Sequence, residues 1–393
     1  MKKKVTVENR NLFTNLDGYG FLLQAEKEGE CLAAEVLEIR AEPGEIITVS
    51  IEEYLPSVSG EYVVTVAAVL KNGDGLLSAG HQAAFGQTTI GKWQPEKRGI
   101  TEEETQQFKV VYGDVNIGVK GKGFSCMFSK GEGGIISLVY DGEEYITRTP
   151  RPSFYRASTD NDKGMQSLYR DSGWIAASMG LQYITDSFRV KESKNAVKIS
   201  TEYQAKFPEK FRCRAEYSIS ASGELEMSLY YPGIRTEDYL PVFGIDFKMK
   251  KEMNCFTYYG YGPEENYPDR MRGAKLGIYQ GTAEENMAKY LIPQECGSRE
   301  GVRYIDITDR NGKGIRVQTA ERPFTASVLP YSVWELENAM HREELPEIHY
   351  TWLRLLAAQT GVGGDDSWGA PVHEQYKVKA DQPISLRFRI RPV

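Results

Sequence analysis

The feature that most constrains the fold of this 393-residue chain is a two-residue alternation of apolar and polar side chains. The alternation recurs in segments rich in β-branched and aromatic residues, which is typical of strands with one buried face. The clearest segments are EIITVSIEE (45–53), EYVVTVAAVL (61–70), AVKISTEYQ (196–204), CRAEYSIS (213–220) and LEMSLYY (225–231). Turn dipeptides such as Asp141-Gly142 and Asn311-Gly312 separate segments of this kind. The sequence therefore predicts an all-β protein with many antiparallel strands.

Helical periodicity is scarce by comparison. Two capping boxes, Thr282 with Glu285 and Ser332 with Glu335, predict two short helices. Strands do not alternate regularly with helices, which excludes a TIM barrel. The sequence also lacks a P-loop, a nucleophile elbow and a dinucleotide-binding glycine motif.

A change in composition divides the chain. Residues 88–107 are polar, highly charged and poor in strand pattern, which is typical of a linker. We therefore predict a first domain over 1–95, a linker over 96–107 and a second domain over 108–393. The first has the length of an immunoglobulin-like sandwich of about seven short strands. The second is too long for one simple sandwich, so we expect a larger two-sheet structure.

Charge and composition exclude several classes of partner. The net charge of -7 leaves no basic excess with which to bind nucleic acid or an anionic membrane. No apolar run is long enough for a transmembrane helix, and no apolar segment follows the basic start MKKK, so we expect a cytoplasmic protein without a secretory signal. The five cysteines are scattered and the four histidines form no close pair. We therefore predict reduced thiols and no metal site.

Four stretches interrupt the strand pattern with clustered polar residues and glycine. They are FYRASTDNDKG (154–164), YYGYGPEENYPDRMRG (258–273), IPQECGSREGVRY (292–304) and GVGGDDSW (361–368). The first could supply oxygen ligands to a cation from Asp160, Asn161 and Asp162, but it does not fit the EF-hand register. A loop that caps its own backbone is the favoured alternative there.

The second and third stretches carry charges of both signs. In the second, Glu264, Glu265, Asp269, Arg270 and Arg272 could form internal ion pairs. In the third, Arg299 could pair with Glu295 or Glu300, as could Arg303. Such pairs are usually structural, so these stretches predict loops that fix the architecture of their domain.

The fourth stretch combines three glycines with Asp365, Asp366 and Trp368. Glycine allows backbone conformations and close approaches that other residues do not. A tryptophan on such a loop could form a flat platform for a sugar ring, or it could fold into the core below a tight turn. The residues alone leave both interpretations open.

Together and in this order, the four stretches resemble the carboxyl-terminal part of the large β-galactosidases of glycoside hydrolase family 2. The residues that carry the resemblance are Arg156–Asp162, Gly260–Arg270, Pro293–Tyr304 and Gly361–Trp368. The segments ENRNLFTNLDGYGFLLQ and GHQAAFGQ near the amino terminus resemble the immunoglobulin-like domain that precedes this part in the family. Ser158 replaces the usual proline of the first motif, and Cys296 stands where asparagine is common.

The resemblance implies an all-β fold, in which an immunoglobulin-like sandwich is followed by a galactose-mutarotase-like super-sandwich. It implies a non-catalytic carboxyl-terminal part or small subunit of a β-galactosidase, which completes the sugar site and supports assembly. The catalytic glutamates and the magnesium ligands of the family belong to a barrel that has no counterpart here. We therefore expect no catalytic residue, metal or cofactor in this chain, and no hydrolysis by the chain alone.

The resemblance also implies site residues and partners. Trp368 matches the tryptophan that lines the galactose pocket in the family, and Asp365 and Asp366 match the acids that shape its loop. With Asp160 and Asn161 of the first motif, they are the predicted substrate-binding residues. The expected partners are the catalytic barrel region of the same or a sister polypeptide, a galactoside substrate and further subunits of an oligomer.

Two other functions remain open at the level of sequence. The first is a stand-alone mutarotase-like epimerase, since the super-sandwich fold is shared with mutarotases. Those enzymes use a histidine and a glutamate, yet none of His341, His349 and His373 lies in a stretch that resembles their site. The second is a free-standing carbohydrate-binding module, which would differ from the leading prediction only in lacking a catalytic partner.

Overall fold

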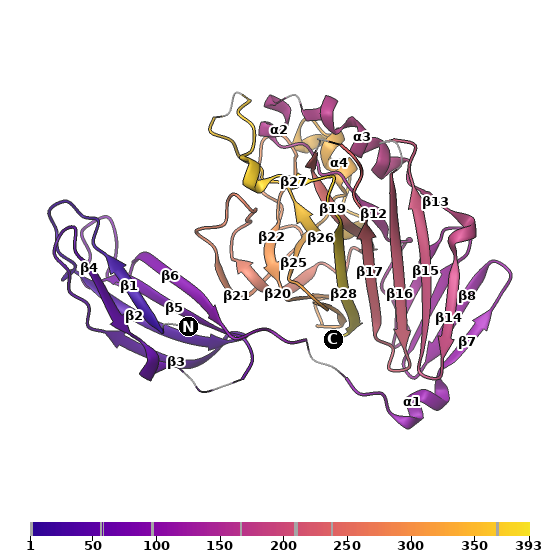
Figure 1. The fold of residues 1–393 in the computed structure, drawn as a ribbon, viewed down its shortest axis with the longest axis horizontal. Helices are drawn as coiled ribbons and strands as arrows, with labels where there is room; N and C mark the ends of the chain where they lie inside the picture. The colour runs from indigo at the N-terminus through magenta and orange to yellow at the C-terminus, as the bar shows by residue number, and fades with distance from the viewer. Residues whose placement is uncertain are drawn as a thin grey trace. The chain divides into compact units, whose positions relative to one another are not determined.

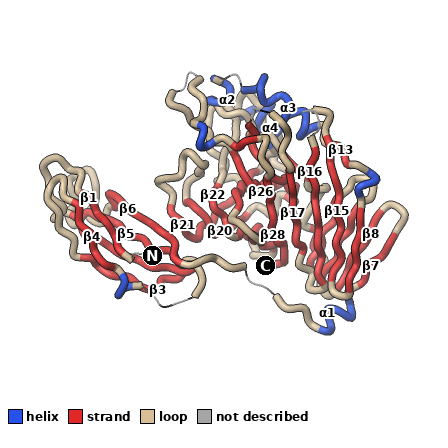
Figure 2. Tube along the Cα trace, in the orientation of Figure 1, coloured by secondary structure: helices blue, strands red, loops and turns tan. Residues whose placement is uncertain are grey.

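The computed structural model describes residues 3–393 except 56, 58, 96–97, 166, 208–210, 237–238 and 367–368. The chain divides into two compact units (Figures 1 and 2). Unit 1 comprises Met1–Gln94 with Lys275–Ile278, and unit 2 comprises Pro95–Ala274 with Tyr279–Val393. Both are dominated by strands, which confirms the all-β prediction. Across the described residues, no helix is long and apolar enough to cross a membrane.

Unit 1 is a small sandwich of two sheets. Its elements are β1 (Lys4–Glu8), β2 (Tyr19–Lys27), β3 (Glu30–Leu37), β4 (Ile46–Ser50), the 3-10 turn η1 (Glu52–Tyr54), β5 (Tyr62–Leu70) and β6 (Gln82–Ile90). One sheet has the order β3-β2-β5-β6 and the other pairs β1 with β4. Phe21, Val64 and Val66 form its core, against which Val5 and Val49 of the smaller sheet pack.

The predicted strands over 45–53 and 61–70 are confirmed as β4 and β5. The expected count of about seven strands is wrong for the described part of this region, which contains six, β1 to β6. The smaller sheet has two strands, whereas the larger has four. The smaller sheet therefore has one strand fewer than the three of a constant-type sandwich.

Unit 2 contains the remaining elements. Up to residue 193 these are α1 (Glu102–Gln107), β7 (Lys109–Tyr112), β8 (Asn116–Gly121), β9 (Phe124–Ser129), β10 (Gly134–Tyr140), β11 (Glu143–Glu144), β12 (Arg151–Ser153), α2 (Asp160–Gly164), α3 (Ser167–Met179), β13 (Gln182–Tyr183), η2 (Thr185–Ser187) and β14 (Arg189–Ser193). The next are β15 (Ala196–Gln204), β16 (Arg212–Ser220), β17 (Leu225–Tyr231), β18 (Tyr239–Leu240), β19 (Val242–Lys250), β20 (Cys255–Gly262), β21 (Lys275–Thr282), β22 (Arg299–Val302), β23 (Tyr304–Thr308) and β24 (Gly314–Thr319). The last are β25 (Phe324–Leu329), α4 (Val333–Asn338), η3 (Arg342–Glu344), β26 (Tyr350–Gln359), η4 (Glu374–Tyr376), β27 (Val378–Lys379) and β28 (Ile384–Pro392).

These strands form large antiparallel sheets. A ten-stranded sheet has the order β13-β15-β16-β17-β28-β24-β23-β20-β21, with β14 added beside β15. Two five-stranded sheets have the orders β12-β19-β26-β25-β22 and β11-β10-β9-β8-β7, and β18 pairs with β27. The predicted strands over 196–204, 213–220 and 225–231 are confirmed as the neighbouring strands β15, β16 and β17.

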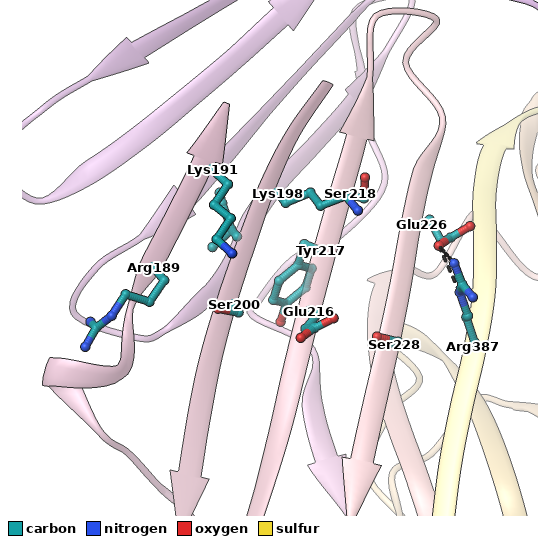
Figure 3. A pocket seen from close by; sticks show the side chains of 11 residues that line it. Arg189, Lys191, Lys198, Ser200, Glu216, Tyr217, Ser218, Glu226, Ser228 and Arg387 are labelled. Carbon is teal, nitrogen blue, oxygen red and sulfur yellow. Dashed lines mark hydrogen bonds and ion pairs between the residues drawn. The ribbon is translucent and has the colours of Figure 1, made fainter. Parts of the chain in front are cut away.

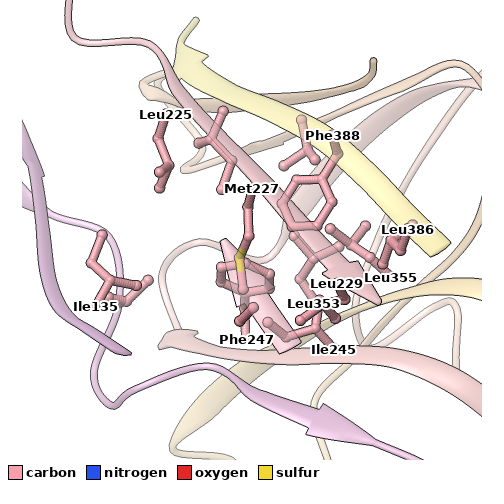
Figure 4. Close-up of a cluster of buried hydrophobic side chains, with 14 of the residues drawn as sticks. Ile135, Leu225, Met227, Leu229, Ile245, Phe247, Leu353, Leu355, Leu386 and Phe388 are labelled. Carbon is pink, nitrogen blue, oxygen red and sulfur yellow. The ribbon is translucent and has the colours of Figure 1, made fainter. Parts of the chain in front are cut away.

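The core of unit 2 lies between the ten-stranded sheet and the sheet that contains β19 and β26 (Figure 4). Met227 on β17 is paired with Phe388 on β28, and Phe247 on β19 is paired with Leu353 on β26. The rings of Phe247 and Phe388 meet edge to face across the two sheets, with centroids 6.1 Å apart. Burial of each such side chain contributes about 1.5–3 kcal/mol. This packing fixes β26, which leads directly into the fourth glycine-rich stretch.

The helix predictions were partly right. The Ser332–Glu335 capping box begins α4, as predicted. The helix predicted after Thr282 is wrong, although the hydrogen bonds of its capping box form. The following residues make only a turn, because the Asn286 side chain donates to two distant carbonyl groups, those of Gly297 and Val328.

Three helices were not predicted. α1 lies within the predicted linker and begins at a Thr101–Glu104 capping box. α2 begins at Thr159, with an aspartate, Asp162, in the place of the usual glutamate. α3 has no comparable signal in its sequence, and Trp174 joins the core from it. Packing of the face of α3 that carries Trp174 therefore stabilises this helix, although its sequence has only a weak intrinsic preference for helix.

Candidate functional site

The first and second stretches contact the fourth, which forms the loop that follows β26. Its anchored half, residues 360–363, is largely buried, and its exposed half, residues 364–366, is open to solvent. The main chain joins the anchored half to unit 2, because Thr360 N donates to Pro241 O at 2.9 Å and Gly361 N donates to Tyr376 O at 2.9 Å. Ser367 and the predicted platform Trp368 lie outside the described residues.

The first stretch holds the loop through a buried arginine. Arg156 is only 2% exposed, and its guanidinium donates to the carbonyl oxygens of Thr360 and Gly361, the latter at 2.9 Å. The same guanidinium binds the Asp162 carboxylate with two hydrogen bonds of 3.1 and 3.0 Å. One side chain therefore links the start of α2 to the start of the loop.

The carboxylate beside Arg156 also caps α2. Thr159 N donates to Asp162 Oδ2 at 3.0 Å, and Asp162 N donates to Thr159 Oγ1 at 3.1 Å. Burial opposes ionisation of Asp162, but the Arg156 guanidinium outweighs it and lowers the pKa of the carboxyl below its ordinary value. The stretch is thus a loop that caps its own backbone, the favoured prediction. Among the described residues, no cluster could hold a metal ion.

The second stretch contacts the loop from its other side. Asp269 Oδ1 accepts from Val362 N at 3.1 Å, and Oδ2 accepts from Gly363 N at 2.7 Å. A Cβ atom on Gly361 would lie 2.6 Å from the Asp269 carboxyl carbon, and one on Gly364 would lie 2.3 Å from Ala370 O. Two of the three glycines are therefore required by close approach. The predicted internal pairing of this stretch is confirmed for Arg270 with Glu265.

The third stretch supports the first. Gln294 accepts from Asp160 N at 3.0 Å and donates to the Asp160 carboxylate at 3.1 Å. The next residue, Glu295, is buried and pairs with Arg354 of β26 at 3.1 Å. Burial raises the pKa of Glu295, and Arg354 offsets the rise only in part. The pairing of Arg299 and Arg303 with Glu295 or Glu300 stays a prediction, whereas Arg354 reaches Glu295 from the strand that leads into the loop.

The exposed half makes a different kind of contact. The Asp365 side chain is 81% exposed and lies 2.8 Å from His373 Nε2, which is itself on the surface. Asp366 accepts from Ala370 N at 3.2 Å, which closes the loop on itself. These contacts leave carboxylate and imidazole edges facing solvent, where a polar ligand could reach them.

The predicted site residues that the structure describes thus have two different positions. Asp365, Asp366 and Asp160 are exposed, whereas Asn161 is half-buried and donates to Val362 O at 2.8 Å. The residues that sequence reasoning missed are the anchors Arg156 and Asp269. The glycines indicated that something approaches the loop closely, but the sequence could not say which side chain.

A separate groove of about 450 Å³ lies on the outer face of the ten-stranded sheet (Figure 3). Its two acidic residues are both engaged. Glu226 binds Arg387 at 2.9 Å and Arg389 at 2.8 Å, and Glu216 pairs with Arg214 at 3.3 Å. The groove therefore offers no free pair of carboxylates of the kind that glycoside hydrolysis requires.

Fold and loop together define an all-β protein with a loop that distant side chains anchor, and comparisons with known proteins identify the family. Residues 120–390 match the family described as beta galactosidase small chain, and residues 5–91 match that described as beta-galactosidase, domain 4. The chain belongs to the β-galactosidase small-chain family.

Individual relatives agree with this assignment. A β-galactosidase of Halalkalibacterium halodurans is 38% identical over all of this chain, which covers 39% of that protein. A β-galactosidase of Streptococcus thermophilus is 33% identical, again over all of this chain and 38% of that protein. A β-galactosidase small subunit of Latilactobacillus sakei is 34% identical over 72% of this chain and 98% of that subunit. The chain thus spans about two fifths of the length of the large relatives.

Among solved structures, a galactose mutarotase related enzyme from Lactobacillus acidophilus is similar to 73% of this chain, with a TM-score of 0.39 and 12% identity. A galactose 1-epimerase from the same species gives a TM-score of 0.40 over 71% of this chain, with 8% identity. The shared sequence is too low, and the superposition too loose, for either likeness to carry an argument about function.

Proposed function

We propose that this chain is a non-catalytic carboxyl-terminal part or small subunit of a β-galactosidase, and that loop 361–368 completes its galactoside site. The observation that supports this most is the convergence of two distant stretches, the first and the second, on that loop. Arg156, Asn161 and Asp269 together make four hydrogen bonds of 2.7–3.1 Å to its backbone, besides the Arg156 bond to Thr360 O. A loop that presents side chains to a ligand requires support of this kind, because a site must be held in its productive geometry.

The exposed half would contact the sugar. In this proposal Trp368 stacks on the ring, and the Asp365 carboxylate accepts hydrogen bonds from sugar hydroxyls. Retaining hydrolysis also needs a nucleophile and an acid/base carboxylate, which the catalytic barrel would supply with its magnesium. This chain would then act on rate by positioning the substrate. The partner is the catalytic region of the same or a sister polypeptide, in an oligomeric enzyme.

Hydrolysis of a nitrophenyl β-galactoside tests the proposal. We expect none from the purified chain. We expect activity from a chimera in which this chain replaces the matching 39% of the Halalkalibacterium relative. Hydrolysis by the isolated chain that survives repurification would contradict the non-catalytic role. An assembled but inactive chimera would contradict the contribution to the sugar site.

A further inference from the structure

Unit 1 contains an apolar groove of about 350 Å³ that the proposed function does not use. One wall is β1, from Lys4 to Val7, and the floor is the inner face of β5 and β6. The lining residues from the floor are Phe21, Ile51, Val64, Val66, Ala68, Ala84, Phe85, Gly86, Gln87 and Thr88. The groove thus runs between the edge of the smaller sheet and the last strand of the larger one.

The floor includes core-facing positions that nothing covers in the described part of unit 1. Val66 is paired with Gly86, and Ala68 is paired with Ala84. Paired residues on neighbouring antiparallel strands point to the same face of the sheet. Since Val66 is in the core, Gly86 and Ala84 face the core side as well, yet both are exposed. The inner face of β6 therefore has the orientation of core without a covering layer.

The wall of the groove has an unpaired backbone edge. Among the described strands, β1 pairs only with β4. At the two ends of this pairing, Ile51 N donates to Lys3 O at 3.0 Å and Asn9 N donates to Glu45 O at 2.9 Å. Hydrogen-bonded positions alternate along an antiparallel strand, so Val5 and Val7 bond to β4. The N–H and C=O groups of Lys4, Thr6 and Glu8 then point to the opposite edge, toward the groove.

We infer that this groove accepts one added β-strand, which pairs with β1 and covers β6. The occupant is an extended segment with alternating apolar and polar residues. An open edge of N–H and C=O groups is satisfied by another strand, not by a compact apolar ligand. The small residues Ala84 and Gly86 leave room for large apolar side chains from that strand.

The architecture places the strand in a definite position. Constant-type immunoglobulin sandwiches have four strands in one sheet and about three in the other, whereas this unit has four and two. An added strand about 4.8 Å from β1 would be the third strand of the smaller sheet. That sheet would then pack about 10 Å above β6. We assign its source to the β-galactosidase polypeptide outside these 393 residues, because the large relatives are longer than this chain. This assignment of the source alone rests on the proposed function.

Peptide binding tests the acceptor site directly. The probe is a capped, fluorescently labelled nonapeptide that alternates valine or phenylalanine with threonine and has lysine at each end. The control peptide carries proline at two of the threonine positions, which blocks strand pairing. We expect the alternating peptide to bind and to slow amide hydrogen exchange at Lys4, Thr6 and Glu8. Equal binding of both peptides, or binding without this protection, would overturn the inference.

A matched pair of variants locates the binding. A Cβ atom on Gly86 would have no heavy atom within 4 Å, so Gly86→Val fits the fold while its side chain fills the groove. We expect this variant to weaken peptide binding by about tenfold or more. Overpacking a site typically costs about 1–3 kcal/mol, and about 1.4 kcal/mol corresponds to a tenfold change in affinity. Thr48→Val, on the exposed outer face of β4, is the control and should bind as the unchanged chain does.

A tethered probe detects binding even where the affinity of the free peptide for the groove is low. The alternating segment is joined to the amino terminus by a glycine-rich linker, which raises its effective concentration to about the millimolar range. We expect the tethered segment to raise the melting temperature of the unchanged chain but not of Gly86→Val. No stabilisation by the tether, with no binding of the free peptide, would overturn the inference. Sugar hydrolysis is not measured, so this result is independent of the proposed function.

Discussion

The two halves of loop 360–366 are adjacent in sequence but are built by opposite means. The anchored half is held by Arg156, which is 2% exposed, and by Asp269. The exposed half carries Asp365. Its side chain is 81% exposed and contacts His373 at the surface. Gly361 in the anchored half and Gly364 in the exposed half both allow a close approach of neighbouring atoms.

This difference shows that the free-energy cost of burying charge arises in the anchored half of the loop. The anchored half depends on the buried charge of Arg156, which is tolerated because it is paired with Asp162 and bonded to two carbonyl oxygens. The side chains of the exposed half lie at the surface, where a ligand can reach them. The anchored half thus supports the exposed half, and four predictions test that division of roles.

Removing Arg156 should have the largest effect. Arg156→Ala would leave Asp162 buried without its cation, which typically costs about 3–5 kcal/mol of unfolding free energy. Urea unfolding of unit 2 measures this loss of unfolding free energy. Arg387→Ala is the matched control, because Arg387 also binds a carboxylate, Glu226, but is half-exposed. We expect the control to lose about 1 kcal/mol or less. Similar losses for both variants would remove the distinction between buried and surface pairs.

Removing Asp269 should loosen the anchored half without unfolding the domain. Asp269→Ala leaves the amides of Val362 and Gly363 without their acceptor, at a cost of about 1–3 kcal/mol. Hydrogen exchange across residues 360–366 should become faster. Asp309→Ala is the control, since Asp309 also accepts from two backbone amides, those of Asn311 and Lys313, in the β23–β24 turn. Unchanged exchange in Asp269→Ala would mean that the loop is fixed by other contacts.

The partly buried carboxyl of Glu300 should make stability depend on pH. Burial raises its pKa, hydrogen bonds from Gln359 and Thr325 offset the rise in part, and Asp269 adds to it. A carboxyl with a raised pKa binds its proton more tightly in the folded state, so stability falls as pH rises above about 4.3, the ordinary glutamate value. Glu300→Gln cannot ionise.

Melting temperatures at pH 4 and pH 7 check this prediction. We expect Glu300→Gln to melt higher than the unchanged chain at pH 7 and at nearly the same temperature at pH 4. The exposed Glu343→Gln is the control and should show no such difference. A gap that widens toward pH 4 would show that Glu300 is stabilising when ionised, contrary to the assigned direction.

Changes in the exposed half should have the smallest effect on stability. Asp365→Asn and His373→Ala each alter a surface contact that is worth about 1 kcal/mol or less. Their melting temperatures should stay close to that of the unchanged chain, while the Michaelis constant of an assembled enzyme rises. A large loss of stability in either variant would assign this half a structural role.

The sequence predicted the fold better than it predicted the site. Alternation along 196–204 or 225–231 is local information, and it was sufficient because one face of each strand is buried. The partners of the loop are not local, since Arg156 and Asp269 lie 205 and 94 residues from the loop backbone that they bind. α3 escaped prediction for the same reason, because its helical state depends on packing around Trp174. Family resemblance brought the four stretches together, but it did not show which side chains join them.

The kinetics of the Halalkalibacterium chimera, with this chain as its carboxyl-terminal two fifths, test the central claim most directly. In that background, Asp269→Ala should lower kcat/KM for a nitrophenyl β-galactoside by about tenfold or more, because misplacement of a positioning group is costly to the rate. Asp309→Ala should leave kcat/KM unchanged, and both variants should assemble as the parent does. If Asp269→Ala matches the parent chimera, the anchored half does not position the sugar site, and the account is contradicted.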